Sequence, residues 1–221
     1  MALTYAQLIA QTHLDILRLD PKAIILGVGV NDGAKCIFGT TKLAAEAFPE
    51  RVIETPLSET MLTGAIIGMA ADGWHPTLVH ARADFLYLSA EHLLNTAATF
   101  RMIHGRGCPI TVRAIIGRGW GNGPMHSKAP LGMFDVEGIA LFTPKTEDAL
   151  VYALTNAVRT GDPTVILEQR HLYEREARRH MSEGTGMEKP IDWSIKHGPA
   201  PASRHLEAAY YGEKYEREGA F

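Results

Sequence analysis

Hydrophobic positions along the chain recur with two spacings, one typical of buried strands and one typical of helices. Short apolar runs predict strands at residues 23–28, 51–54, 77–81, 110–116, 140–143 and 164–168. Between them, apolar residues three and four positions apart predict helices at residues 5–17, 41–48, 59–71, 85–103 and 147–158. Strands that alternate with helices are typical of a parallel sheet. We therefore expect an α/β fold with three layers, a mostly parallel sheet with helices on both faces.

Local signals mark where several of these elements begin and end. Thr4 and Gln7 have the spacing of a capping box, and Pro21 ends the first helix. Pro56 prevents the preceding strand from continuing, and Ser58 is a candidate N-cap for the helix that follows. That helix is rich in glycine and alanine, so we expect another backbone to pack closely against it.

Three candidate functional residues follow predicted strands, namely Glu59, Phe85 and His126. Ligands of open parallel sheets bind outside the carboxyl ends of the strands, so one sheet edge is expected to collect these residues. Each has a plainer interpretation. Glu59 could complement a helix dipole, Phe85 could be a core aromatic, and His126 could be an exposed loop histidine.

Composition narrows the classes of function. The 221 residues are 46% hydrophobic with a formal net charge of -3, and no long basic run favours nucleic acid or an anionic membrane as partner. Cys36 and Cys108 provide neither a disulfide framework nor zinc spacing, and we expect both to be small buried residues. The N-terminus reads as a helix rather than a signal peptide, and we expect a cytoplasmic protein.

Two glycine-rich segments fail to match nucleotide-binding motifs. In the first, Asp32 occupies the last glycine position of Gly-x-Gly-x-x-Gly, and in the second Asn122 does. No Gly-x-x-x-x-Gly-Lys-[Ser/Thr] sequence occurs either. A dinucleotide-binding fold and a phosphate-binding loop are therefore weakly supported.

Six segments in a fixed order point to a known family. Downstream of Glu54-Thr55-Pro56-Leu57-Ser58-Glu59, they are Arg82-Ala83-Asp84-Phe85-Leu86-Tyr87, Asn95-Thr96-Ala97-Ala98, Cys108-Pro109-Ile110-Thr111-Val112-Arg113-Ala114, Gly119 to Ser127, Thr146-Glu147-Asp148-Ala149, and Asp162-Pro163-Thr164-Val165-Ile166-Leu167-Glu168. In this order and spacing, residues 3–175 resemble the pyrimidine-binding domain of thiamine-diphosphate enzymes. The resemblance is greatest to the N-terminal domain of the β-subunit of 2-oxoacid dehydrogenase E1 components, with transketolase a more distant relative.

The resemblance implies a role for each of the three residues. Glu59 would hydrogen-bond N1′ of the cofactor's aminopyrimidine and exchange a proton with it, for which burial should raise the glutamate pKa. Phe85 would stack on the aminopyrimidine ring. His126 would face the substrate and stabilise or protonate the developing oxyanion. The implied cofactor is thiamine diphosphate, and the implied substrate is a small molecule, a 2-oxoacid or a related ketone.

The resemblance also implies a partner chain. The Gly-Asp-Gly segment with a downstream Asn, which holds Mg2+ and the diphosphate in thiamine enzymes, is absent from this sequence. An α-type subunit would carry that half of the site, in an α2β2 hetero-oligomer. Many E1 β-chains also bind K+ through backbone carbonyls, and the matching stretch here is Ile110 with residues 157–162.

The chain departs from the family pattern in two places. Val28-Gly29-Val30 stands where acidic residues are usual, and after residue 175 we do not expect the third domain with which family β-chains continue. Residues 176–221 form a polar extension that either wraps the domain or serves as a partner-binding arm. We expect a β-type subunit of a thiamine-diphosphate enzyme that performs decarboxylation, acyl transfer or aldehyde transfer. The alternative is a catalytically idle regulatory or scaffolding subunit with the same fold.

Overall fold

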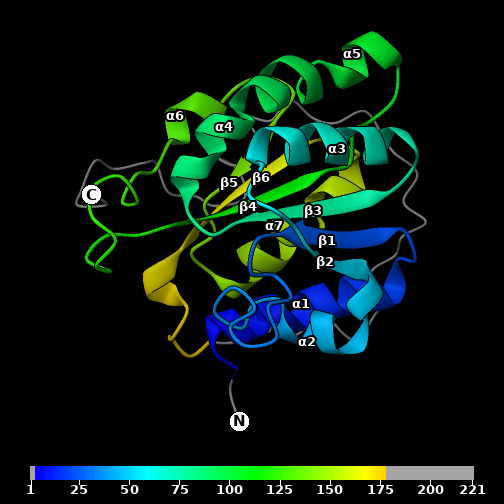
Figure 1. Cartoon of the computed structure of the whole chain (residues 1–221). Coiled ribbons are helices and arrows are strands. Elements are labelled where there is room, and N and C mark those ends of the chain that lie inside the picture. Colours follow the sequence, from blue (N-terminus) through cyan, green and yellow to red (C-terminus); the bar gives the residue numbers. More distant parts are fainter. Residues whose placement is uncertain (1–2, 178–221) are drawn as a thin grey trace.

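A single parallel sheet organises the computed structural model, which describes residues 3–177 (Figure 1). Its strand order is β2-β1-β3-β4-β6-β5, and every pair of neighbours is parallel. The strands are β1 (Ala23–Gly27), β2 (Val52–Glu54), β3 (His75–His80), β4 (Thr111–Ile116), β5 (Ala140–Phe142) and β6 (Thr164–Gln169). All six strands expected from the sequence are present, with ends within two residues of the prediction.

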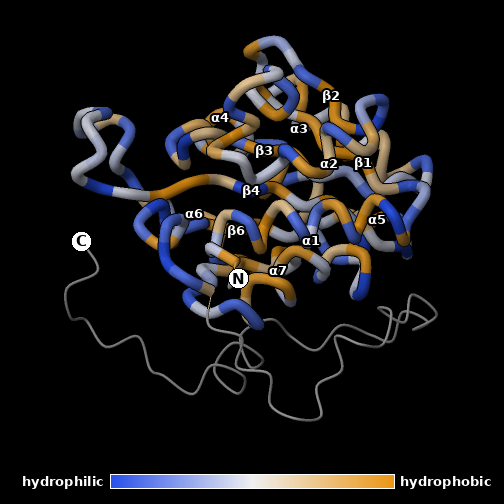
Figure 2. The backbone as a smooth tube through the Cα atoms, turned by 90° about the horizontal axis from the view of Figure 1, so that it is seen from below, coloured by the Kyte–Doolittle hydropathy of each residue, from blue (hydrophilic) through white to orange (hydrophobic). Residues whose placement is uncertain are grey.

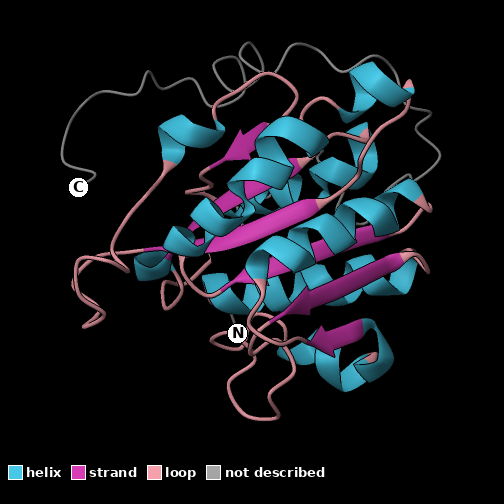
Figure 3. Ribbon diagram, turned by 45° about the horizontal axis from the view of Figure 1, so that its top comes forward, coloured by secondary structure: helices cyan, strands magenta, loops and turns pink. Residues whose placement is uncertain are grey.

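Helices cover both faces of the sheet, which confirms the expected three layers (Figures 1 and 3). One layer contains α1 (Tyr5–Leu19), α2 (Lys42–Ala47) and α7 (Glu147–Thr160). The other contains α3 (Glu59–Ala71), α4 (Leu86–Glu91), α5 (Phe100–His104) and α6 (Leu131–Phe134). Each layer buries a separate hydrophobic cluster against the sheet, so β1, β3, β4 and β6 are covered on both sides. Burial on both faces explains why these strands read as continuous apolar runs.

The first helix follows its sequence signals closely. The Thr4 backbone N–H donates to Gln7 Oε1 at 2.8 Å, and the Gln7 N–H donates to Thr4 Oγ1 at 3.2 Å, which confirms the capping box. The helix ends at Leu19, just before Pro21. Figure 2 shows hydrophobic and hydrophilic positions alternating along α1 and α7, as expected for helices that cover a core on one side only.

The long helix expected at residues 85–103 is wrong as a single element. The chain instead makes a short 3-10 turn (Ala83–Phe85), α4, a π-helical stretch (His92–Ala97) and then α5. Thr99 Oγ1 donates to the Asn95 carbonyl at 2.6 Å. Threonine and asparagine side chains compete in this way with regular helical hydrogen bonds. The spacing of apolar residues predicts a helix but does not reveal a widened, π-helical turn within it.

The segment between β1 and α2 is held by two acidic side chains. Glu54 at the end of β2 accepts hydrogen bonds from the backbone N–H groups of Gly29 and Asn31, the latter at 3.0 Å. Asp32 Oδ1 accepts from three successive N–H groups, at residues 34–36. Residues 36–38 then form a left-handed turn, with φ of 42°, 47° and 56°, although none of them is glycine. Such a turn costs about 1–2 kcal/mol per residue, so the surrounding contacts must hold it in place.

A fully buried polar cluster lies between the sheet and α1. Arg113 on β4 pairs with Glu168 on β6, and both side chains are 0% exposed. Arg113 Nη1 contacts His13 Nε2 at 2.8 Å, and the Tyr173 hydroxyl donates to Glu168. Burial raises the pKa of Tyr173 and lowers that of His13 well below its usual value. The cluster therefore contains one ion pair, Arg113 with Glu168, and two neutral partners, His13 and Tyr173.

The described chain ends against its own beginning. Glu176 bridges to Thr4, and the Ala177 N–H donates to the Leu3 carbonyl at 2.7 Å. The rest of the expected extension, residues 178–221, lies outside the described residues. Among residues 3–177, no helix is long and apolar enough to cross a membrane. Cys36 and Cys108 are both buried, as expected, and burial raises the pKa of the Cys108 thiol to about 12.

Candidate functional site

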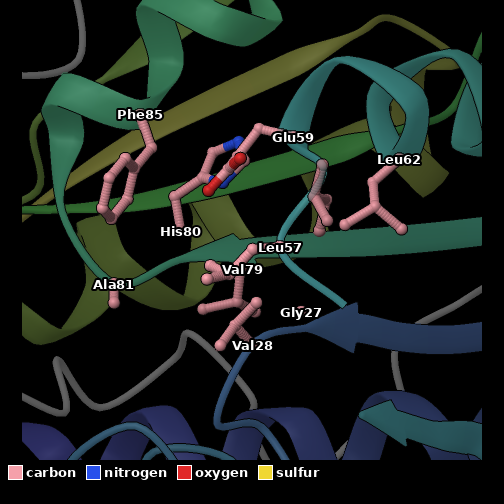
Figure 4. Close-up of a pocket in the computed structure, with 10 residues that line it drawn as sticks. Gly27, Val28, Leu57, Glu59, Leu62, Val79, His80, Ala81 and Phe85 are labelled. Atoms are coloured by element: carbon pink, nitrogen blue, oxygen red, sulfur yellow. The ribbon is translucent and has the colours of Figure 1, made fainter. Parts of the chain in front are cut away.

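A hollow opens at the carboxyl edge of β1 and β3 (Figure 4). The end of β1, the end of β3, the start of α3 and the turn that precedes α4 form its walls. Most of its wall is apolar, and two of its side chains can exchange protons. The lining residues are Gly27, Val28, Leu57, Glu59, Leu62, Leu78, Val79, His80, Ala81 and Phe85.

Gly27 allows the strands to come together at the floor of this hollow. Its φ is +155°, and a Cβ atom there would lie 2.6 Å from the Val79 carbonyl oxygen and 2.9 Å from a Val30 methyl carbon. Both contacts are closer than a real Cβ atom can tolerate. A side chain at residue 27 would therefore push β1 away from β3 and distort the floor.

Glu59 is the first residue of α3, where the sequence placed it. Ser58 is the N-cap residue, as expected, but its side chain makes no capping hydrogen bond, so that part of the prediction is wrong. The Glu59 carboxylate points into the hollow and is only partly exposed. The apolar side chains of Leu57 and Leu62 stand on either side of it along the chain, and both line the same space.

Phe85 and His126 lie next to each other, as the sequence suggested. Their ring centroids are 5.8 Å apart at an interplanar angle of 61°. His126 Nδ1 lies 3.0 Å from Asp84 Oδ2, whose side chain is 9% exposed. The carboxylate accepts the proton on Nδ1, which leaves Nε2 as the nitrogen able to act on a ligand. Phe85 lines the hollow together with Glu59, whereas His126 contacts the Phe85 ring without being one of the lining residues.

His80 is a lining residue that the sequence did not identify. It is the last residue of β3. It is 3% exposed, and burial lowers the pKa of its imidazole to about 4, so the ring is neutral at pH 7. Its Nε2 lies 2.9 Å from Ser89 Oγ on α4. The sequence carried no signal for His80 as a site residue, because a histidine at the end of an apolar run looks like any other buried strand position.

Arg82 joins the glycine-rich loop to the edge of the sheet. Its guanidinium lies 4.5 Å from the centre of the Trp120 ring and donates to Asn122 Oδ1 at 3.3 Å. It also lies 5.9 Å from the Phe38 ring, over which Arg170 lies at 4.6 Å. Burial and the nearby Arg170 lower the pKa of Arg82, against the opposing effect of Asp84. Two guanidinium groups thus gather at Phe38, and the charge of Arg82 interacts with that of Asp84, the partner of His126. The sequence did not identify these two arginines as site residues.

The backbone stretch that matches the K+ site of E1 β-chains is hydrogen-bonded within the protein. Arg101 donates to the Thr160 carbonyl at 2.9 Å and to Asp162 Oδ1 at 2.8 Å. The Gly161 carbonyl accepts from the Cys108 N–H at 2.8 Å, and the Ile110 carbonyl accepts from the Thr164 N–H at 2.9 Å. Arg101 supplies a positive charge at the Thr160 carbonyl and Asp162, whereas the other two carbonyls accept from neutral N–H groups.

The donors in the hollow suit one half of thiamine diphosphate. A flat aromatic heterocycle with ring nitrogens fits apolar walls, an aromatic side chain and a carboxylate. A magnesium diphosphate does not fit, because it requires several oxygen ligands and phosphate-binding N–H groups. Within residues 3–177, no group of three or more His, Cys, Asp or Glu side chains could hold a metal ion.

Curated relatives share this part of the chain. The acetoin:2,6-dichlorophenolindophenol oxidoreductase subunit beta of Cupriavidus necator is 31% identical over 166 residues, which cover 70% of this chain and 49% of that protein. The mitochondrial 2-oxoisovalerate dehydrogenase subunit beta of Chaetomium thermophilum is 35% identical over 162 residues, 70% of this chain and 34% of that protein. The mitochondrial pyruvate dehydrogenase E1 component subunit beta-1 of Arabidopsis thaliana is 33% identical over 159 residues, again 70% of this chain, and 43% of that protein. The chain thus spans between a third and a half of the length of these relatives.

A solved structure and a family model agree on the fold. A chain described as "Split gene transketolase, inactive beta4 tetramer" superimposes with a TM-score of 0.61 at 18% identity, covering 77% of this chain and 52% of that one. The model of the transketolase pyrimidine-binding domain matches residues 1–176. The family model covers the described fold up to residue 176, and with it the hollow that contains Glu59 and Phe85. The chain therefore belongs to the family of transketolase pyrimidine-binding domains.

Proposed function

We propose that this chain is the aminopyrimidine-binding, β-type subunit of a thiamine-diphosphate-dependent enzyme that acts on a 2-oxoacid or a related ketone donor. The observation that carries the proposal is the meeting of Glu59 and Phe85 in one hollow, with the His126 ring against the ring of Phe85. The named relatives, which are β-subunits of oxidoreductases and dehydrogenases, support the same reaction class.

The proposed role of Glu59 is to hold and exchange a proton with a ring nitrogen of the cofactor. A carboxyl group suits this role because it can both accept and donate at one position. Phe85 supplies an aromatic surface that orients the ring. Thiamine diphosphate, when bound, supplies the carbon nucleophile that adds to the substrate carbonyl.

The proposed role of His126 is at the substrate. Asp84 keeps the proton on Nδ1, so Nε2 can accept a proton or, once protonated, donate one to an oxygen that becomes negative. Arg82 and Arg170, which meet over Phe38, give this side of the site a positive charge. That charge favours an acidic substrate such as a 2-oxoacid over a neutral one.

The proposal requires a second chain. This chain offers no site for the diphosphate and Mg2+ among its described residues, so an α-type partner would carry both. A two-fold α2β2 assembly is the simplest closed arrangement. K+ is not needed by the proposal, since Arg101 already occupies the Thr160 carbonyl.

Co-expression with a partner that carries Gly-Asp-Gly and a downstream Asn tests the proposal. The purified complex should bind thiamine diphosphate in the presence of Mg2+, exchange the C2 proton of the bound cofactor, and turn over at least one member of a 2-oxoacid panel. A complex that assembles but neither binds the cofactor nor exchanges its C2 proton would favour the alternative of an idle scaffolding subunit.

A further inference from the structure

A chain of three hydrogen bonds leads from the hollow into the body of the protein. His80 Nε2 lies 2.9 Å from Ser89 Oγ, which lies 2.8 Å from Thr63 Oγ1. Thr63 Oγ1 in turn lies 2.7 Å from the backbone carbonyl oxygen of Glu59. The Ser89 and Thr63 side chains are fully buried, and His80 is 3% exposed, so no water competes along this chain.

The number of available hydrogens determines the direction of all three bonds. The Glu59 carbonyl has no hydrogen, so Thr63 must use its only hydroxyl hydrogen there. Ser89 must then donate to Thr63, because two oxygens 2.8 Å apart need a hydrogen between them. Ser89 has no second hydrogen, so the bond to His80 must be donated by the Nε2–H of the imidazole. A neutral His80 therefore carries its proton on Nε2 and leaves Nδ1 unprotonated.

The unprotonated nitrogen belongs to the side chain that lines the hollow. Within residues 3–177, Nδ1 of His80 has no hydrogen-bond partner. The fully buried polar atoms without a partner do not include it, so this nitrogen is not completely enclosed by protein. Figure 4 shows the His80 ring and the Glu59 carboxylate directed into the same part of the hollow, with Phe85 beside them. An acceptor facing a mostly apolar space favours a ligand that brings an N–H or O–H donor.

We propose that His80 is a further residue of the aminopyrimidine site, and that its unprotonated Nδ1 accepts a hydrogen bond from the exocyclic amino group of the bound ring. The inference rests on the proposed function, because it takes the ligand of the hollow to be an aminopyrimidine. The exocyclic amino group carries the only N–H bonds of a neutral aminopyrimidine. The same hydrogen-bond chain ends on the Glu59 backbone, so it also ties the orientation of His80 to the start of α3.

The tautomer of His80 can be measured without any ligand. Nitrogen NMR of the full-length chain labelled in its histidine rings should show His80 with Nε2 protonated and Nδ1 unprotonated at pH 7. The His80→Phe variant assigns the signal by removing it. A proton on Nδ1 in the wild-type chain would overturn the inference, whatever the chain binds.

A matched pair of threonine substitutions tests the direction of the hydrogen bonds. Thr63→Val removes the acceptor of Ser89 and frees its hydrogen for His80 Nε2, so the His80 proton should move to Nδ1. Thr60→Val is the control, because Thr60 lies on the same helix but donates to the Leu88 carbonyl, which is not part of the series of hydrogen bonds from His80 to Glu59. Circular dichroism confirms that both variants fold. If Thr63→Val leaves the His80 tautomer unchanged, the proposed direction of the three hydrogen bonds is wrong.

Two small probes test the role in binding. In NMR titrations, 4-amino-2,5-dimethylpyrimidine should bind the full-length chain more tightly than 2,5-dimethylpyrimidine, which lacks the amino group. His80→Phe and Thr63→Val should each reduce this preference about fivefold, the effect of one hydrogen bond. His75→Phe, on the same strand but paired with Asp20 at its opposite end, should leave the preference unchanged.

The outcomes separate the inference from the proposed function. If the amino preference survives His80→Phe, the role of His80 is wrong and the proposed function stands. If neither pyrimidine perturbs the signals of His80 or Glu59, either in the chain alone or in its complex with the α-type partner, the pocket does not take this ring, and both fail.

Discussion

At the scale of single residues, the carboxyl group of Glu59 is where the proposed chemistry depends most on one side chain. Glu59→Gln keeps nearly the same shape and can still hydrogen-bond, so folding and cofactor binding should survive. Glutamine cannot give and retake a proton, and C2-proton exchange of the bound cofactor should slow by about a hundredfold or more. The measurement is hydrogen–deuterium exchange of the cofactor in the assembled complex. Exchange at the wild-type rate would leave Glu59 as a helix-terminal acid and remove the basis of the proposed function.

Two buried histidines predict how stability depends on pH. Burial lowers the pKa of His13 and of His80, the latter to about 4, while the unfolded chain takes up these protons near pH 6.5. The unfolded state therefore binds more protons below pH 6.5, and the free energy of unfolding falls as the pH falls from about 6.5 to about 4. For His80 alone the loss amounts to about 3 kcal/mol over that range.

Urea titrations from about pH 7 to about pH 5 measure this loss as a falling midpoint. His80→Phe should reduce the pH dependence, because it removes one of the two histidines. His104→Phe, at an exposed position, should leave the dependence as it is in the wild-type chain. A wild-type midpoint that does not change with pH would show that neither imidazole is held neutral in the folded state.

At the scale of elements, the contact between β1 and β3 depends on Gly27. Gly27→Ala places a Cβ atom 2.6 Å from the Val79 carbonyl in a conformation with φ of +155°, so the strands must separate. We expect a loss of about 2 kcal/mol or more in the free energy of unfolding. Gly68→Ala is the control, since nothing lies within 4 Å of its added Cβ atom and alanine favours helices by about 1 kcal/mol. Equal effects of the two substitutions on urea midpoints would contradict the close approach.

The pair between β4 and β6 predicts a second effect on stability. Glu168→Leu leaves the Arg113 charge fully buried without its partner, which should cost about 3–5 kcal/mol. Arg113→Met combined with Glu168→Leu removes both charges and should recover most of that loss. Urea unfolding of the single and double variants gives the comparison. A double variant as unstable as Glu168→Leu alone would mean that the buried pair is not the cause.

At the scale of the whole molecule, the missing half of the site predicts how the chain behaves alone. The purified chain should bind thiamine diphosphate weakly or not at all, because no described residues hold the diphosphate and Mg2+. Calorimetry of the chain with and without its partner measures this. With the partner, light scattering should report two copies of each chain. Tight magnesium-dependent binding by the chain alone, or an active one-to-one complex, would contradict the shared site.

The sequence by itself determined the order of strands and helices and the place where the candidate site forms. Glu59, Phe85 and His126 lie 26 and 41 residues apart, yet each follows a strand. Parallel strands end at one edge of a sheet, so local periodicity was enough to bring these three residues to that edge. The capping box at Thr4 and the start of α3 at Glu59 were equally readable, because helix ends depend on a few neighbouring residues.

Tertiary structure alone decided which polar groups meet inside. His13 contacts Arg113 across 100 residues of sequence, and Thr63 meets Ser89 across 26. Neither pair has a local signature, because each depends on how a helix packs against the sheet or against another helix. The tautomer inferred for His80 likewise follows from two hydroxyl groups, a carbonyl and an imidazole that only packing brings together. Periodicity reports which positions are covered, whereas the partners of a covered polar group are set by long-range packing.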